Sequence, residues 1–216
     1  MHLTPWSTTK SSAHPNETLV VARNNFAACV NAVAQQADKG LLVTLPPALV
    51  ALAQDWKELF SRTADVNPEA VFFYGNYLVK DSKSENLQTV RKDIGDITER
   101  EDWGPVWAAR AEWLNGIGGL DETHHRAAFY DLLLKSRGRR VHVGGTLATV
   151  KGIESSAEAE AAKSKLFFPG RGKLGGFSYL FMDPEEEQHT ENVFYNFLKR
   201  ENAWLEGERT NLPPAL

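Results

Sequence analysis

The chain has 216 residues, of which 42% are hydrophobic and 24% are charged, and its net charge is −4. This composition can bury a core, which excludes a disordered chain, and every uncharged apolar run is far shorter than the roughly 18 residues of a membrane span. The single cysteine, Cys29, excludes an internal disulfide. We therefore expect a cytoplasmic protein with no membrane partner; a secreted protein that needs no disulfide is the alternative.

The chain is expected to form one domain, because no long proline- or serine-rich linker divides it. Residues 1–16 are polar and lack the charged-then-apolar order of a secretory signal, so we predict a flexible amino-terminal arm. Residues 17–206 make up the predicted α+β domain. Residues 207–216, which include a proline pair, are predicted to be a C-terminal tail.

The first elements are predicted from apolar periodicity. Residues 17–36 indicate a helix, and the apolar run 41–45 a short strand. The proline pair at 46–47 is typical of a helix start. Apolar residues at three- and four-residue spacing predict that this second helix runs on through the following positions: Leu49, Leu52, Ala53, Trp56, Leu59 and Phe60.

The next region, residues 70–79, is apolar or aromatic at odd and even positions alike. This pattern predicts a buried strand with a bulge at Gly75, although the Asn-Pro-Glu run at 67–69 could instead begin a helix. The polar residues 80–101 are predicted to form a loop that contains a short helix at 87–94.

A tryptophan-rich segment follows a capping-box pattern at 98–101. Its aromatic residues share helical spacing and predict a helix that ends at Gly116: Trp103, Trp107 and Trp113. We expect this face to be core, and an exposed anchor for a partner protein is the alternative. Asp121 is predicted to cap the next helix, which ends near Arg137.

The second half is predicted to begin with a long strand at 139–150, broken by a bulge at Gly144-Gly145. An alanine-rich helix at 155–166, a strand at 177–182 and a last helix from 184 to about 206 follow. The predicted fold is α+β, a mostly helical single domain with a small sheet that we expect to be antiparallel. Its strands lie near 41–45, 70–79, 139–150 and 176–182.

Positive charge is concentrated between Lys135 and Lys173, where nine basic side chains stand against three acidic ones. The stretch ends in a loop of alternating glycines and cations: Gly170, Arg171, Gly172 and Lys173. Glycines let the backbone approach a phosphate, and the cations neutralise its charge. The loop lacks the Gly-Lys-Ser/Thr ending of a P-loop, and it precedes a predicted strand, the reverse of the dinucleotide-binding order.

The segment Gly170-Arg-Gly-Lys-Leu-Gly-Gly-Phe177 resembles the glycine-rich loop near the carboxyl end of CRISPR repeat-processing endoribonucleases. The resemblance covers about eight residues and implies that Arg171 and Lys173 contact RNA. In that family a histidine, often with a tyrosine or lysine, promotes attack of a ribose 2′-hydroxyl on the adjacent phosphate. This chain departs from the family in the forty or so residues that follow the loop and in its helical first half. A turn loop without a ligand is the alternative.

A second basic cluster, Arg137, Arg139, Arg140 and His142, lies at the start of the predicted strand. Alternation places Arg140 and His142 on one face, which would contact phosphate if exposed, with Tyr179 as a stacking platform on a neighbouring strand. Cations that decorate the carboxyl end of a helix explain the cluster equally well.

The sequence contains no persuasive catalytic, metal or cofactor motif. His124 and His125 are adjacent, and neighbouring helical positions point about 100° apart, so they could not easily share one ion. Cys29 lies in an apolar helix and is expected to pack as a small hydrophobe.

The sequence thus favours a nucleic-acid-binding protein that contacts RNA or DNA through the basic strand and the glycine loop. Two alternatives stay open. One is a non-enzymatic adaptor or inhibitor that binds a partner protein through aromatic and acidic helices. The other is a nuclease or phosphate-transferring enzyme that uses His142 or His124.

Overall fold

The structure is a computed structural model of the whole chain, and it describes residues 26–37, 39–45, 49–82, 84–95, 97, 102–152 and 184–204. Several sequence-based predictions concern residues outside these ranges. They are the arm at 1–16, the capping box at 98–101, the helix at 155–166, the glycine loop, the strand at 177–182 and the tail at 207–216.

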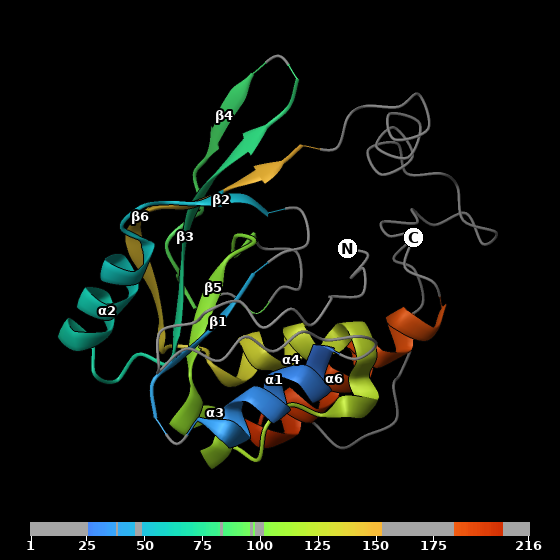
Figure 1. Cartoon of the computed structure of the whole chain (residues 1–216). Helices are drawn as coiled ribbons and strands as arrows, with labels where there is room; N and C mark the ends of the chain where they lie inside the picture. The colour runs from blue at the N-terminus through green and yellow to red at the C-terminus, as the bar shows by residue number, and fades with distance from the viewer. Residues whose placement is uncertain are drawn as a thin grey trace.

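A six-stranded mixed sheet forms the centre of the molecule (Figure 1). The order is β1-β5-β3-β6-β2, with β4 paired to β3 as a hairpin that projects from one end (Figure 1). The strands are β1 (Leu41–Thr44), β2 (Leu49–Leu52), β3 (Phe72–Lys80), β4 (Glu85–Gln88), β5 (Trp107–Arg110) and β6 (Arg140–Lys151).

The prediction of a mostly helical domain with a small antiparallel sheet is wrong, although α+β holds as the class. The two central strands, β3 and β6, run parallel from Phe72 opposite Arg140 to Lys80 opposite Lys151. A parallel pair needs a crossover connection, and here α3 and α4 lie between the two strands in the chain. Two four-residue strands, β2 and β5, lie where we predicted helices, and a third, β4, overlaps the predicted loop and the start of the helix predicted at 87–94, so the sheet is larger than expected.

Helices cover the two faces of the sheet unequally (Figure 1). One face packs against α1 (Phe26–Gln36), α3 (Ala111–Gly116) and α4 (Ala128–Lys135), with α6 (Pro184–Arg200) packed on α4. The 3₁₀ helix η1 (Glu122–Ala127) precedes α4. The other face carries α2 (Trp56–Val66) alone among the described helices.

The two faces follow from strand alternation on β3. Phe72 and Tyr74 point into the core under α1 and α4, while Phe73 points into the core under α2, and all three side chains are fully buried. Burial of such side chains stabilises by about 1.5–3 kcal/mol each. The predicted buried strand at 70–79 is therefore confirmed.

Glycines create the irregularity that both central strands were predicted to have. Between Tyr74 and Asn76 of β3 the pairing partner moves from His142 to Thr146 of β6, so β6 carries a bulge at Gly144 and Gly145. A Cβ on Gly75 would lie 2.8 Å from Val143 Cγ2, and Gly144 has a φ of +78°. Both positions need glycine. The bulge predicted at Gly144-Gly145 is confirmed, whereas the bulge predicted at Gly75 is wrong, because the extra residues are on β6 and Gly75 lies opposite them.

The tryptophans are core, as the sequence analysis expected. Trp103, Trp107 and Trp113 are at most 9% exposed, and the Trp107 ring lies 5.3 Å from that of Phe72. The single helix predicted through them is wrong, because Trp107 lies on β5 and α3 begins only at Ala111. Among the described residues, no helix is both long and apolar enough to cross a membrane.

Candidate functional site

The predicted basic strand begins with an arginine that is buried rather than exposed. The Arg140 side chain is 1% exposed and donates from Nε to Asp93 Oδ2 (3.0 Å) and from Nη2 to Asp93 Oδ1 (2.9 Å). Its guanidinium also lies over the Trp103 ring, 4.3 Å from the centroid. Bidentate pairing and an aromatic face are typical of a structural arginine.

Arg137 and Arg139, by contrast, have exposed side chains at the turn between α4 and β6. Each donates one hydrogen bond from Nε to a backbone carbonyl: Arg137 to Gly95 (2.9 Å) and Arg139 to Glu69 (3.2 Å). Arg139 also lies 5.9 Å from the Trp113 ring centroid. Both residues are exposed, and neither guanidinium is paired with a carboxylate of the described residues.

Residues 89–95, which we call the covering segment, lie over the face of β6 that was expected to be open. Asn76 Oδ1 accepts the Val90 N–H (2.9 Å), and the Tyr74 hydroxyl donates to the Arg91 carbonyl (3.1 Å). Further hydrogen bonds hold the segment closer to α4. Asp93 accepts two from Arg140, and the Gly95 carbonyl accepts one from Arg137. The start of β6 is therefore covered by protein on this face.

The covering segment carries two cations of its own. Arg91 and Lys92 are exposed, and Ile94, which follows them in the same segment, is 73% exposed. We call Arg91, Lys92, Arg137 and Arg139 together the basic edge. The hydrogen bond of Arg137 with Gly95 links the covering segment to the turn that carries Arg137 and Arg139. The sequence analysis missed Arg91 and Lys92 because they are distant in the chain; the adjacent Arg-Lys pair in a polar run was the available signal.

His142 lies under the covering segment with both ring nitrogens in hydrogen bonds. The Gly144 N–H donates to Nδ1 (2.9 Å), and Nε2 lies 3.0 Å from Asn76 Oδ1. Burial, with a smaller contribution from the Lys92 charge, lowers the pKa of His142 below its ordinary value. A neutral imidazole whose nitrogens are both occupied is poorly placed to act as a general base.

Tyr74 shares this environment, and its ring packs edge-on against His142 with centroids 5.3 Å apart. Burial raises the pKa of the Tyr74 phenol to about 12. The phenol therefore stays protonated at neutral pH and acts here as a donor to the covering segment.

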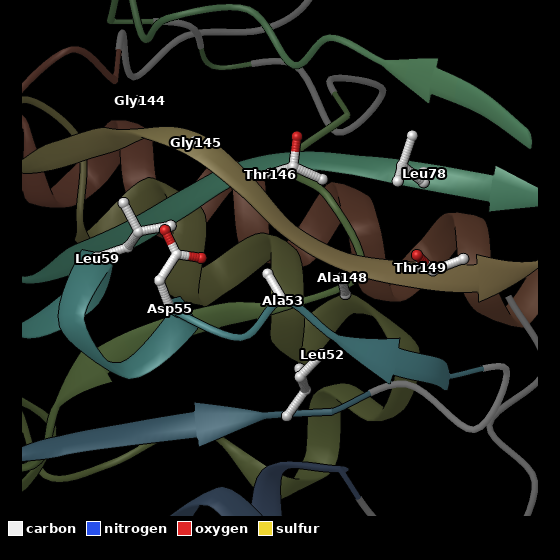
Figure 2. Close-up of a pocket in the computed structure, with 10 residues that line it drawn as sticks. All are labelled: Leu52, Ala53, Asp55, Leu59, Leu78, Gly144, Gly145, Thr146, Ala148 and Thr149. Carbon is white, nitrogen blue, oxygen red and sulfur yellow. The ribbon is translucent and has the colours of Figure 1, made fainter.

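A pocket of about 540 Å³ lies beside the β6 bulge (Figure 2). Its walls come from β6, from Leu78 of β3 and from the connection between β2 and α2 (Figure 2). Asp55 supplies its one charged side chain, and Gly144 and Gly145 form part of its wall. A Cβ on Gly145 would lie 2.8 Å from Leu59 Cδ1, so glycine permits the close contact of the bulge with α2.

His124, one of the histidine pair considered from sequence, lies between Asp121 and His189. His124 is buried, its Nε2 lies 3.4 Å from Asp121 Oδ2, and its ring centroid is 6.4 Å from that of His189 on α6. Hydrogen bonds from Thr123 lower the pKa of Asp121. In the part of the chain that the structure describes, no group of three or more His, Cys, Asp or Glu side chains is arranged to hold a metal ion.

Of the predicted nucleic-acid contacts, the structure brings together Arg137, Arg139, Arg140 and His142. Gly170, Arg171, Gly172 and Lys173 lie outside the described residues, as does Tyr179. The exposed aromatic surface considered for a partner protein does not exist at Trp103, Trp107 and Trp113, whose side chains are buried.

Comparison with known proteins adds no assignment. No model of a protein family matches the chain, and no similar protein was found among curated proteins. The geometry of the site is therefore the basis for the functional argument.

Proposed function

We propose that the protein binds nucleic acid through the basic edge, with Arg137 and Arg139 as the principal phosphate contacts. The observation that carries the proposal is the state of these two side chains. Both are exposed, and within the described part of the chain each donates from Nε to a carbonyl and has no carboxylate partner. A guanidinium held at Nε still presents its Nη groups to a phosphate.

The charge balance of this edge supports the same function. Arg91 and Lys92 extend the positive surface along the covering segment, while the one described acid of that segment, Asp93, is neutralised by Arg140. The protein as a whole has a net charge of −4, so the basic edge is a local excess. Phosphate contacts of this kind bind independently of sequence and weaken as salt rises.

The predicted contacts have different roles within this proposal. Arg140 and His142 support the surface from beneath, because Arg140 is buried against Asp93 and His142 is held by Asn76 and Gly144. Gly170, Arg171, Gly172 and Lys173 are proposed as a second phosphate-binding segment on the sequence argument alone.

Binding to fluorescein-labelled single-stranded RNA and DNA 20-mers, measured by anisotropy between 25 and 200 mM salt, tests the proposal. The double variant Arg137→Gln/Arg139→Gln should weaken binding to both probes. It should also reduce the slope of log K against log salt by about 0.7 for each phosphate that the protein no longer neutralises.

The matched control is Arg62→Gln/Lys151→Gln, which removes the same charge from exposed positions of α2 and β6. It should leave the slope unchanged and alter affinity less than the first variant. An equal loss of affinity in both variants would indicate a non-specific charge effect and contradict the proposed surface. Absence of binding at 25 mM salt would reject the function.

A further inference from the structure

The bulge of β6 is held by a side chain of its own strand. His142 precedes the bulge, and its Nδ1 accepts the N–H of Gly144, the residue with a φ of +78°. A Cβ on Gly144 would meet nothing within 4 Å, so no side-chain packing is formed at this position. The imidazole contact is therefore a direct restraint on the Gly144 N–H.

The hydrogen bonds assign one tautomer to His142. Asn76 Oδ1 accepts the Val90 N–H (2.9 Å), which identifies that atom as the amide oxygen. Because Nε2 lies 3.0 Å from this oxygen, Nε2 carries the proton. Nδ1 is then the bare acceptor that the Gly144 N–H requires. The arrangement is complete only when the imidazole is neutral.

The neighbours of His142 disfavour a positive charge on the ring. Tyr74 of β3 packs against the ring, and the positive charge of Lys92 in the covering segment lowers the pKa of the ring. Arg140 lies two residues earlier on the same face of β6. The carboxylate in this environment, that of Asp93, is engaged by Arg140. No described carboxylate makes a hydrogen bond to the imidazole.

We propose that His142 is a pH-sensitive switch for the β6 bulge and for the pocket wall that the bulge forms. Protonation places a hydrogen on Nδ1, which then points at the N–H of Gly144. Two donors cannot share that contact, so either the ring or the bulge moves. Gly144 and Gly145 line the pocket, and this movement changes its wall. The observations that support the switch do not depend on the proposed nucleic-acid binding.

Nuclear magnetic resonance of the ¹⁵N-labelled full chain between pH 8 and pH 5 tests the switch. At pH 8, His142 should be the Nε2–H tautomer. On acidification, the Gly144 amide shift should change with the same midpoint as the His142 ring, below the ordinary value of 6.5. The protection of the Gly144 amide, corrected for intrinsic exchange, should fall about tenfold.

The variant His142→Asn separates the charge from the hydrogen bond, because an asparagine oxygen can accept the Gly144 N–H and does not titrate. It should remove the pH dependence of Gly144, whereas His189→Asn, on α6, should retain it. An Nδ1–H tautomer at pH 8 would overturn the proposal. A Gly144 amide that stays unchanged while the wild-type His142 ring titrates would do the same.

Discussion

Arg140 and its near neighbours Arg137 and Arg139 are alike in sequence and opposite in environment. Arg140 is buried, paired with Asp93 and stacked on Trp103, whereas the other two are exposed and donate to backbone carbonyls. The first supports the fold, and the others are the residues that we propose as phosphate contacts. Neighbouring residues of a strand point to opposite faces, and the burial of each side chain depends on what covers its face. The three arginines should therefore respond differently to substitution.

The largest effect is expected from Asp93→Asn. The change leaves the buried Arg140 charge without its counter-ion and should destabilise the protein by about 3–5 kcal/mol in urea denaturation. Asp102→Asn is the control, because this exposed carboxylate accepts hydrogen bonds from the Tyr77 hydroxyl and the Gly104 N–H. It should cost about 1 kcal/mol or less. Similar losses of stability in the two variants would refute the special role of the buried pair.

The pH dependence of stability should give an intermediate effect that also distinguishes the covered region from the exposed one. The folded state lowers the pKa of His142, so protons bind more readily to the unfolded chain. The stabilisation is present in full above pH 6.5 and is lost as the pH falls through the folded pKa. Urea denaturation from pH 7.5 to 5 should show a steeper loss for the wild type than for His142→Asn. Parallel curves would contradict the assignment.

The smallest effect is expected from Arg137→Gln/Arg139→Gln in the absence of nucleic acid. Exposed side chains with one hydrogen bond each contribute little, and the free energy of unfolding should change by about 0.5 kcal/mol or less. A loss of several kcal/mol would mean that these arginines belong with Arg140 as structural residues. It would also remove the basis for using this variant as a binding probe.

The elements that were predicted correctly are those whose local sequence pattern favours one type of secondary structure. Residues 70–79 are apolar on both parities, and a strand buried on both faces accepts that pattern. Gly144-Gly145 interrupts a β-branched run, which is typical of a bulge. A helix was likewise recognised before the basic residues at 135–137, although the α-helix ends at Lys135, and the part that follows the predicted cap Asp121 is a 3₁₀ helix.

The predictions failed at short strands whose apolar residues also fit helical spacing, whereas the equally short β1 was predicted as a strand. Leu49 and Leu52 fit helical spacing with Trp56 and Leu59, yet they lie on β2, which pairs with β6 about a hundred residues later. Four residues cannot display a period of two clearly enough to compete with a longer helical pattern. Trp107 was likewise predicted to lie on a helix but lies on β5. The residues with which it pairs, Thr44 and Tyr74, are distant in the chain.

The candidate site was predictable only in part. The sequence identified Arg137, Arg139, Arg140 and His142 as a cluster, and alternation correctly put Arg140 and His142 on one face. It could not show that the covering segment lies on that face, because the attachment depends on Asn76 and Tyr74 of another strand. Nor could it join Arg91 and Lys92 to the cluster.

By itself, the sequence determined the composition of the core, the local charge excess and the places where only glycine fits, because these depend on side-chain chemistry and nearby backbone geometry. The tertiary structure decided which strands pair, that β3 and β6 run parallel, and which arginine is buried. Those outcomes depend on contacts between residues tens of positions apart. A local pattern carries no record of such contacts, and burial of a charge is settled only when its counter-ion, here Asp93, arrives from another segment.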